Sequence, residues 1–252
     1  MQSKLPDIYL FNPTCEYAVA NGNISWQPNR LLQKMETDLA VLPMYFASRK
    51  DFVITEKSPT ERFLERVRLV SNEIPSFFSK REILKPSFCE IPKNRLLPWG
   101  WSPAAHKLLS PLKNNCSPEF KQSPVFNWNP EYREIYSKQF ALNLLRILIR
   151  EIRANYFISN HLIPEICRTR AEVEMLIKKW DKIMVKAPWS SSGRGLQPVT
   201  KTPVHPKVWE KITGIFKEQG YVIVEPYLHK IHDFSFQFEM KNRGFYEDKV
   251  QQ

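Results

Sequence analysis

The most informative stretch of the sequence is Val185-Lys186-Ala187-Pro188-Trp189-Ser190-Ser191-Ser192-Gly193-Arg194-Gly195-Leu196. It joins an apolar strand, predicted over residues 182–187, to a loop of small residues. Lys186 lies near the end of that strand, where an unpaired ammonium loses much of its hydration and therefore needs an anion nearby. The loop that follows offers two glycines and several backbone N–H groups, which can approach and cover phosphate oxygens. The stretch thus predicts an anionic ligand. The alternative is a solvent-exposed hairpin turn with Lys186 at a sheet edge.

Other phosphate-binding and nucleophile loops do not match the order of residues in this stretch. It contains no Gly-Lys-Ser or Gly-Lys-Thr, and its glycines follow the strand lysine, whereas in protein kinases they precede it. The nucleophile turn of serine hydrolases also fails, because no glycine stands two positions before Ser191. Walker-type, kinase-type and serine-hydrolase sites are therefore excluded for this loop.

A second apolar strand, predicted over 220–225, leads into Glu225-Pro226-Tyr227-Leu228. A strand that exits into a hinge can offer a carbonyl and a nearby N–H to the edge of adenine, and Pro226 would lose only a donor that is not needed there. The alternative is an edge strand ended by proline. Asp233, eight residues beyond Glu225, can accept hydrogen bonds from ribose hydroxyls or can be an ordinary surface aspartate.

The first half of the chain alternates predicted strands and helices, which indicates an α/β layer. Residues 14–22 and 96–102 are expected to be loops, and the polar, proline-bearing residues 113–129 a linker or long surface loop, with a domain boundary near 128. Ser58 is predicted to cap a helix over 59–70 as part of a capping box with Glu61, and Ser102 is predicted to cap a helix over 103–110. The expected strands are 8–11, 39–46 and 52–54, and the expected helices are 59–70 and 103–110.

The second half has one long amphipathic helix, predicted from Lys138 to about residue 155 and capped by Ser137. Thr169 and Glu172 form a capping box for a second helix over 170–180. Strands are expected at 162–166, 182–187 and 220–225. An alternating segment over 233–238 predicts a hairpin with 245–246.

Charge and cysteine content limit the classes of partner. The 252 residues contain 37 Lys and Arg against 26 Asp and Glu, a formal net charge of +11. The cations are scattered and no nucleic-acid-binding motif accompanies them, so the sequence argues against a nucleic-acid partner. It shows no apolar run long enough to span a membrane and no signal-peptide pattern, so we expect a cytoplasmic protein without a membrane partner. Four separated cysteines are expected to be reduced and buried: Cys15, Cys89, Cys116 and Cys167.

The order of these motifs resembles the ATP-grasp superfamily of carboxylate–amine or carboxylate–thiol ligases. In that family a lysine opens a helix, a short strand with proline follows, and a second lysine precedes a Gly/Ser loop and an acidic hinge. Here Lys138, residues 163–164, Lys186 with its loop, and 225–228 occupy those places. The resemblance covers residues 130–240. It implies a Rossmann-like α/β domain over 1–128, followed by a partial ATP-grasp-like α+β domain over 129–252.

The resemblance also implies which residues bind ATP. Lys138 and Lys186 would neutralise the α- and β-phosphates. Pro226 C=O and Leu228 N–H would bind adenine, with Glu225 and Asp233 as partners of its amino group and of the ribose. The activity implied is activation of a small-molecule carboxylate as an acyl phosphate, which an amine then attacks. The residues expected to cover the phosphates are Ser191, Ser192, Gly193 and Gly195.

The end of the chain departs from the family pattern. ATP-grasp enzymes hold Mg²⁺ with a later acidic residue and a Glu and Asn pair, and no matching residues follow Asp233. Glu239, Glu247 and Asp248 are interpreted as turn and tail charges, and His229 and His232 as solvated rather than as metal ligands. Phosphoryl transfer loses its main charge stabilisation without the metal. The alternative function is therefore a non-catalytic nucleotide- or nucleic-acid-binding protein. The polar residues of 14–23 suggest a substrate-side loop.

Overall fold

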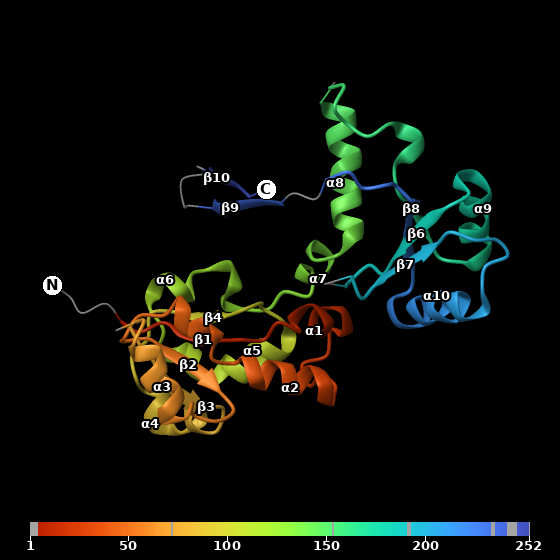
Figure 1. The fold of residues 1–252 in the computed structure, drawn as a ribbon. Coiled ribbons are helices and arrows are strands. Elements are labelled where there is room, and N and C mark those ends of the chain that lie inside the picture. Colours follow the sequence, from red (N-terminus) through yellow and green to blue (C-terminus); the bar gives the residue numbers. More distant parts are fainter. Residues whose placement is uncertain are drawn as a thin grey trace.

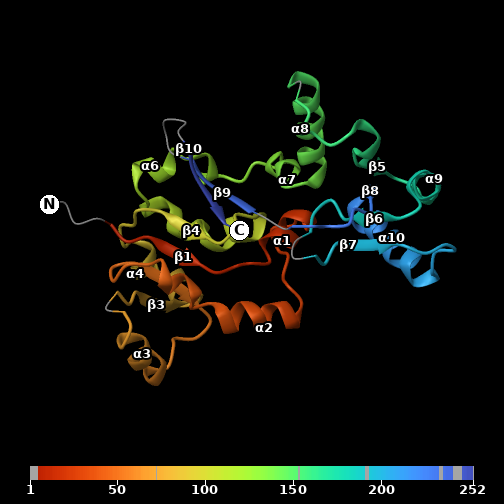
Figure 2. The same ribbon diagram turned by 45° about the horizontal axis from the view of Figure 1, so that its top comes forward.

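A computed structural model describes residues 5–71, 73–152, 154–190, 193–232, 235–240 and 246–251. It has a parallel sheet in the first half of the chain and an antiparallel sheet in the second, which lie in separate parts of the molecule (Figures 1 and 2). The predicted α/β class is confirmed. Within these residues, no helix combines the length and the apolar character needed to cross a membrane.

The N-terminal sheet has the order β3-β2-β1-β4, and every neighbouring pair is parallel. The apolar runs β1 and β2 are largely buried, as parallel strands between helices are, whereas β3 at the sheet edge is only partly covered. Residues of β1, β2 and β4 pack in one core with the segment from Leu109 to Phe120. The strands are β1 (Ile8–Leu10), β2 (Phe52–Thr55), β3 (Ser76–Ser79) and β4 (Leu96–Pro98).

Six α-helices and four 3₁₀ turns surround this sheet in the described residues. Ser102 accepts a hydrogen bond from the Ala105 N–H at 3.2 Å and Pro103 opens α5, as predicted. The helices are α1 (Cys15–Asn21), α2 (Arg30–Leu39), α3 (Glu61–Arg68), α4 (Pro86–Cys89), α5 (Pro103–Leu109) and α6 (Pro118–Lys121), and the turns are η1 (Leu42–Tyr45), η2 (Glu82–Leu84), η3 (Ser110–Asn115) and η4 (Pro124–Phe126).

Several predictions for the first half were wrong. The expected loop at 14–22 contains α1, which ends at Gly22 in the left-handed conformation (φ 76°). The expected strand at 39–46 is the end of α2 and the turn η1, because Pro43 favours a turn and a short apolar run does not distinguish strand from helix. Thr60, not Ser58, caps α3. The expected loop at 96–102 begins with strand β4.

The first part of the expected linker at 113–129 belongs to the N-terminal core, whereas residues 121–129 are exposed or only partly buried. Cys116 and Phe120 are buried there with β1 and β4, and Lys113 is buried as well. A polar, proline-rich stretch reads as a loop because its few apolar residues have no regular period. Their burial is set by contacts with strands that are distant in sequence.

The second half forms the antiparallel sheet β5-β8-β6-β7. Ile183 and Val185 of β6 are fully buried against α9 and α10, which cover the same face. A separate antiparallel hairpin follows, so the predicted hairpin is confirmed. The elements are α7 (Tyr132–Ile135), α8 (Lys138–Glu151), η5 (Asn160–Leu162), β5 (Glu165–Cys167), α9 (Arg170–Trp180), β6 (Ile183–Lys186), β7 (Leu196–Val199), α10 (Pro206–Gln219), β8 (Val222–Pro226), β9 (Ser235–Met240) and β10 (Tyr246–Gln251).

The caps in this half follow the predictions. Ser137 caps α8, and both hydrogen bonds of the Thr169–Glu172 capping box are present at α9. Gly220 is the left-handed cap of α10 rather than the start of β8. The strand expected at 162–166 is β5, which begins only at Glu165. The sequence interpretation did not identify α10 or β7.

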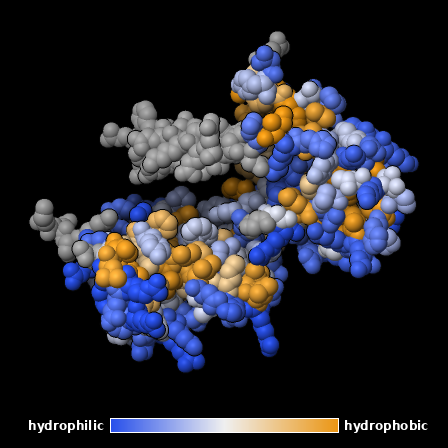
Figure 3. All heavy atoms as spheres, viewed as in Figure 1, coloured by the Kyte–Doolittle hydropathy of each residue, from blue (hydrophilic) through white to orange (hydrophobic). Residues whose placement is uncertain are grey.

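The apolar stripe of α8 is largely uncovered in the described residues. Leu142 is its buried residue, and Figure 3 shows apolar side chains gathering over this helix. The helix itself was predicted correctly from its 3- to 4-residue spacing. Its exposed large apolar residues are Phe140, Leu144, Ile147 and Leu148.

The cysteines and two lysines depart from the expected division between core and surface. All four cysteines are free, as expected, but Cys15 and Cys89 are only partly buried. Lys93 is fully buried, and its ammonium donates to the carbonyls of Phe88 at 2.9 Å and Cys89 at 3.0 Å. Lys113 is buried as well. Part of the net positive charge therefore lies inside the N-terminal core.

We expect Ile212→Ala to lower the free energy of unfolding by about 2–5 kcal/mol, because it leaves a cavity where α10 packs on β6. Denaturant titration measures this loss. Ile231→Ala, the same substitution at a side chain that is 87% exposed, is the control and should change stability by less than about 0.5 kcal/mol. Equal losses in both variants would contradict the packing described here.

We expect stability to fall between pH 6.5 and pH 4 because of His106. Burial, with help from the Lys113 ammonium 2.8 Å from its Nδ1, lowers the pKa of His106 from 6.5 to about 4. Across that interval the unfolded chain binds a proton that the folded chain does not, so acid favours unfolding, by at most about 3 kcal/mol. NMR titration of the imidazole resonances measures the pKa directly. A His106 midpoint near 6.5 would contradict the prediction, and His106→Asn should flatten the stability profile.

Candidate functional site

The predicted lysine of the central strand lies on the open face of the antiparallel sheet. Along β6 buried and partly buried residues alternate, so Ile183 and Val185 face α9 and α10 while Lys186 faces the other side. β6 lies between β8 and β7. Lys186 is therefore on an interior strand and not at a sheet edge. The turn of the alternative interpretation is nevertheless present, because β6 and β7 are antiparallel neighbours.

Lys186 has an anionic partner within the chain. Its Nζ lies 2.5 Å from Oε1 of Glu225 on β8, and each of the two side chains is 27% exposed. The sequence interpretation predicted that Glu225 binds the amino group of adenine and that Lys186 binds an anionic ligand. The structure instead pairs the two residues, because antiparallel pairing of β6 with β8 places both side chains on the open face of the sheet. A half-buried ammonium is thus neutralised by its neighbouring strand.

The second predicted lysine contacts the loop that follows β6. Lys138 opens α8, and its N–H donates to the Pro188 carbonyl at 2.9 Å. Its Nζ donates to the Ser190 carbonyl at 2.9 Å and to the Ser190 hydroxyl at 2.8 Å. Burial lowers the pKa of Lys138, and the positive charge of Lys186 lowers it further, against an opposing effect of Glu16. Lys138 thus contacts the loop that directly follows Lys186 on β6.

The loop between β6 and β7 is held by its own backbone. Gly195 accepts a hydrogen bond from the Ala187 N–H at 2.8 Å, and Gly193 accepts one from the Leu196 N–H at 3.1 Å. Gly193 is left-handed (φ 73°), which favours glycine. Ser191 and Ser192, the other predicted phosphate-covering residues, lie outside the described residues.

The predicted adenine hinge lies at the other end of β6. Pro226 is buried and pairs in register with Ile183, whereas Lys186 pairs with Ile223. Leu228 is exposed just beyond the strand. The Pro226 backbone and Lys186 are thus separated along the sheet by the length of β6, about 10 Å, although the Glu225 side chain reaches Lys186. Asp233, the predicted ribose partner, lies outside the described residues.

An arginine and a tryptophan that the sequence interpretation did not assign to the site connect its loop to the N-terminal half. The Arg133 guanidinium lies 3.8 Å from the centre of the Trp189 ring, and the Trp189 indole donates to the Arg133 carbonyl at 2.8 Å. The same guanidinium donates to the carbonyls of Val19 and Ala20 at the end of α1. Nothing in the local sequence signals this contact, because it joins three distant segments.

Helix α1 also contributes to the site from the side of the parallel sheet. Arg194 of the loop donates to the Tyr17 hydroxyl at 3.4 Å, and Glu16 opposes the lowering of the Lys138 pKa. The acidic Glu16 in the first turn and Gly22 after the last are the local signals that could have identified this helix. Residues 14–23, expected to be a substrate-side loop, thus place a helix near Lys138 and Arg194.

No protein-family model matches the sequence. No curated protein matches it. Among solved structures, D-alanyl-alanine synthetase A from Vibrio cholerae O1 biovar eltor str. N16961 is similar, with 11% identity, 98% of this chain and 66% of that chain covered, and a TM-score of 0.46. An N5-carboxyaminoimidazole ribonucleotide synthetase in complex with ADP is also similar, with 11% identity, coverage of 99% and 54%, and a TM-score of 0.43.

This chain spans 66% and 54% of the length of the two proteins.

The described residues do not fit a Mg²⁺ site, since they contain no group of three or more His, Cys, Asp or Glu residues that could hold a metal ion. Glu239, Glu247 and Asp248 were interpreted as turn and tail charges. The expected turn and tail conformation was wrong, because the three residues belong to the paired strands β9 and β10. Glu239 is in register with Glu247. The alternating pattern of 233–238 was recognised as a strand, but its partner was placed too early in the chain.

We expect Gly195→Ala to lower the free energy of unfolding by about 1–3 kcal/mol, because the new methyl group would overlap the Ser190 side chain and lie 2.9 Å from Ala187 Cβ. Gly214→Ala, in the middle of α10 with open space around its Cβ, is the matched control. It should raise stability by up to about 1 kcal/mol. Thermal unfolding of both variants compares them, and a stable Gly195→Ala protein would contradict the close packing of the loop.

Proposed function

We propose that residues 129–252 form an ATP-binding domain that follows a distinct domain over residues 1–128, and that Lys138 and Lys186 contact the phosphates of ATP. The observation that carries this proposal is that Lys138, at a helix start, contacts the glycine-containing loop that directly follows Lys186 on its strand. Two lysines held near each other repel, and burial of Lys138 adds to the cost. A polyphosphate is the ligand that relieves both.

Glu225 would release Lys186 when the nucleotide binds. Each side chain of the Lys186–Glu225 pair is 27% exposed, so the two charges are partly hydrated and can separate at modest cost. A triphosphate carries more charge than a carboxylate and competes for the ammonium. Pro226 and Leu228 at the far end of β6 would then contact the base, so that base and phosphates bind at opposite ends of one strand.

The reaction class proposed is the activation of a carboxylate for attack by an amine. The γ-phosphoryl group of ATP would pass to a carboxylate oxygen, ADP would leave, and an amine would displace inorganic phosphate to form an amide. The support is the order of motifs from Lys138 to Leu228, together with the placement of Glu16 near Lys138 and of Tyr17 against Arg194. No catalytic step is assigned to Mg²⁺.

Calorimetric titration with Mg·ATP tests the proposal. The parent protein should bind, and Lys138→Ala and Lys186→Ala should each weaken binding by roughly 10- to 100-fold, because each removes a charge-assisted contact to phosphate. A protein that does not bind ATP at all would overturn the proposal.

Lys179→Ala is the matched control for these variants. Lys179 of α9 also forms an ion pair with a glutamate of this sheet. Its partner, Glu165, is 2.7 Å away and lies on the edge strand β5. Lys179→Ala should leave the affinity for ATP unchanged. If all three lysine variants weaken binding equally, the effect is one of net charge and the assignment of Lys138 and Lys186 to the phosphates is wrong.

A further inference from the structure

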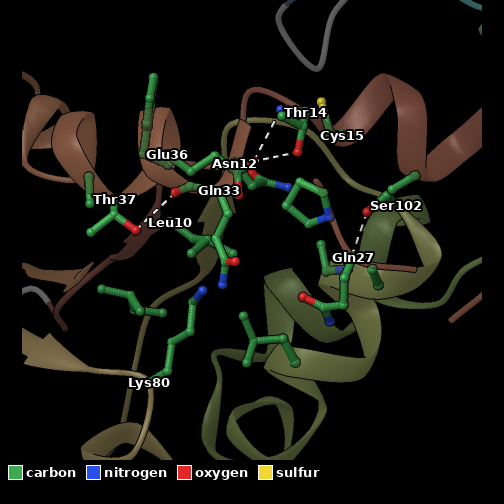
Figure 4. A pocket seen from close by; sticks show the side chains of 18 of the residues that line it. Leu10, Asn12, Thr14, Cys15, Gln27, Gln33, Glu36, Thr37, Lys80 and Ser102 are labelled. Carbon is green, nitrogen blue, oxygen red and sulfur yellow. Dashed lines mark hydrogen bonds between the residues drawn. The ribbon is translucent and has the colours of Figure 1, made fainter. Parts of the chain in front are cut away.

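A cavity of about 200 Å³ lies at the carboxyl edge of the parallel sheet (Figure 4). The ends of β1 and β2 line it at Leu10 and Thr55, and Ser102 lines it from the segment after β4. From β1 the chain moves outward through β2 and β3 and then returns to the other side of β1 with β4. Open α/β sheets bind ligands at the carboxyl ends of strands where the strand order reverses in this way. The cavity lies at that position.

Thr55 carries a polar group that lacks a partner among the residues that the structure describes. Thr55 is 2% exposed, its hydroxyl forms no hydrogen bond within that part of the chain, and the residue lines the cavity. A buried hydroxyl without a partner is unfavourable, and such groups in folded proteins are generally satisfied. A ligand in the cavity would supply the missing partner.

Charged groups of both signs line the same cavity. Glu36 of α2 accepts hydrogen bonds from the N–H and the hydroxyl of Thr14, and Lys80 forms an ion pair with Glu56. In Figure 4 the Lys80 side chain extends toward Gln33 across the cavity. Two carboxylates and one ammonium thus give the lining a formal charge of −1.

This charge pattern selects among ligands. A phosphate or nucleotide would meet Glu36 and Glu56, and the turn after β1 reads Asn12-Pro13-Thr14 without the glycines of a dinucleotide-binding loop. A molecule with an amine and a carboxylate matches both signs. Apolar residues such as Leu10, Ile54 and Leu108 also line the cavity, and they can cover a small carbon skeleton.

We propose that this cavity binds a free amino acid, whose ammonium group pairs with Glu36, whose carboxylate pairs with Lys80, and whose polar atoms include a hydrogen-bond partner for the Thr55 hydroxyl. The cavity is larger than an engineered site of about 150 Å³ that holds benzene, so it has room for such a molecule. It shares no residue with the Lys138–Lys186 site, and the proposal does not depend on ATP binding.

Thermal-shift and calorimetric titrations of the whole protein without nucleotide, using the standard amino acids in both enantiomers, test the proposal. At least one of them should bind and raise the unfolding temperature. For that amino acid, the decarboxylated amine and the deaminated acid should each bind at least about tenfold more weakly, because each lacks one of the two charged contacts. If no amino acid binds, or if either analogue binds as tightly as the amino acid, the proposal is overturned.

Three variants separate a ligand site from a structural feature. Glu36→Gln and Thr55→Val should each weaken amino-acid binding about tenfold or more. Thr55→Val should unfold at the same or a higher temperature than the parent when no ligand is present, since it removes an unpartnered hydroxyl of equal size. Asp38→Asn is the control, because Asp38 is on the same helix as Glu36 but forms an exposed pair with Lys34. It should bind like the parent.

Unchanged binding in Glu36→Gln and Thr55→Val would show that the amino acid binds elsewhere and would overturn the assignment. Lys186→Ala should retain amino-acid binding even where ATP binding is lost. The two proposals can therefore fail independently of each other.

Discussion

A half-buried ammonium on an interior strand is the constraint around which the antiparallel sheet is arranged. Lys186 cannot be left unpaired on β6, and the neighbouring strand β8 supplies Glu225 at 2.5 Å. The pairing requires β6 and β8 to be adjacent and in one register, which the core of Ile183, Val185 and Val224 against α9 and α10 also requires. The polar contact on one face and the apolar core on the other therefore specify the same strand pairing.

Lys138 and Lys186 are both next to the loop that follows β6, because α8 begins at a contact with this loop. The Lys138 N–H and ammonium both contact that loop, so the helix start is fixed to it at two points. Trp189 fixes the base of the loop, with Arg133 on one side and Gln219 of α10 on the other. The loop is thus attached at its base, while Gly193 and Arg194 are exposed.

Helix α1 links the two candidate sites. Cys15 and Ala18 line the cavity of the parallel sheet, whereas Glu16 acts on Lys138 and Tyr17 contacts Arg194. Its last carbonyls accept hydrogen bonds from Arg133, which also packs on Trp189. A ligand that moved this short helix would affect both sites, because residues of α1 contribute to both.

Local chemistry in the sequence determined the elements with strong signals. The caps at Ser102, Ser137 and Thr169 and the apolar runs of β1, β2 and β6 were identified because each depends on residues within about four positions. Lys186 and the glycine loop were singled out for the same reason, whereas Lys138 was assigned only through the family resemblance. Tertiary structure alone decided the partner of Lys186, the burial of Lys113, Cys116 and Phe120, the cavity and the Arg133–Trp189 contact. These join residues that are distant along the chain, and an interaction between distant residues leaves no periodic or local signal in the sequence.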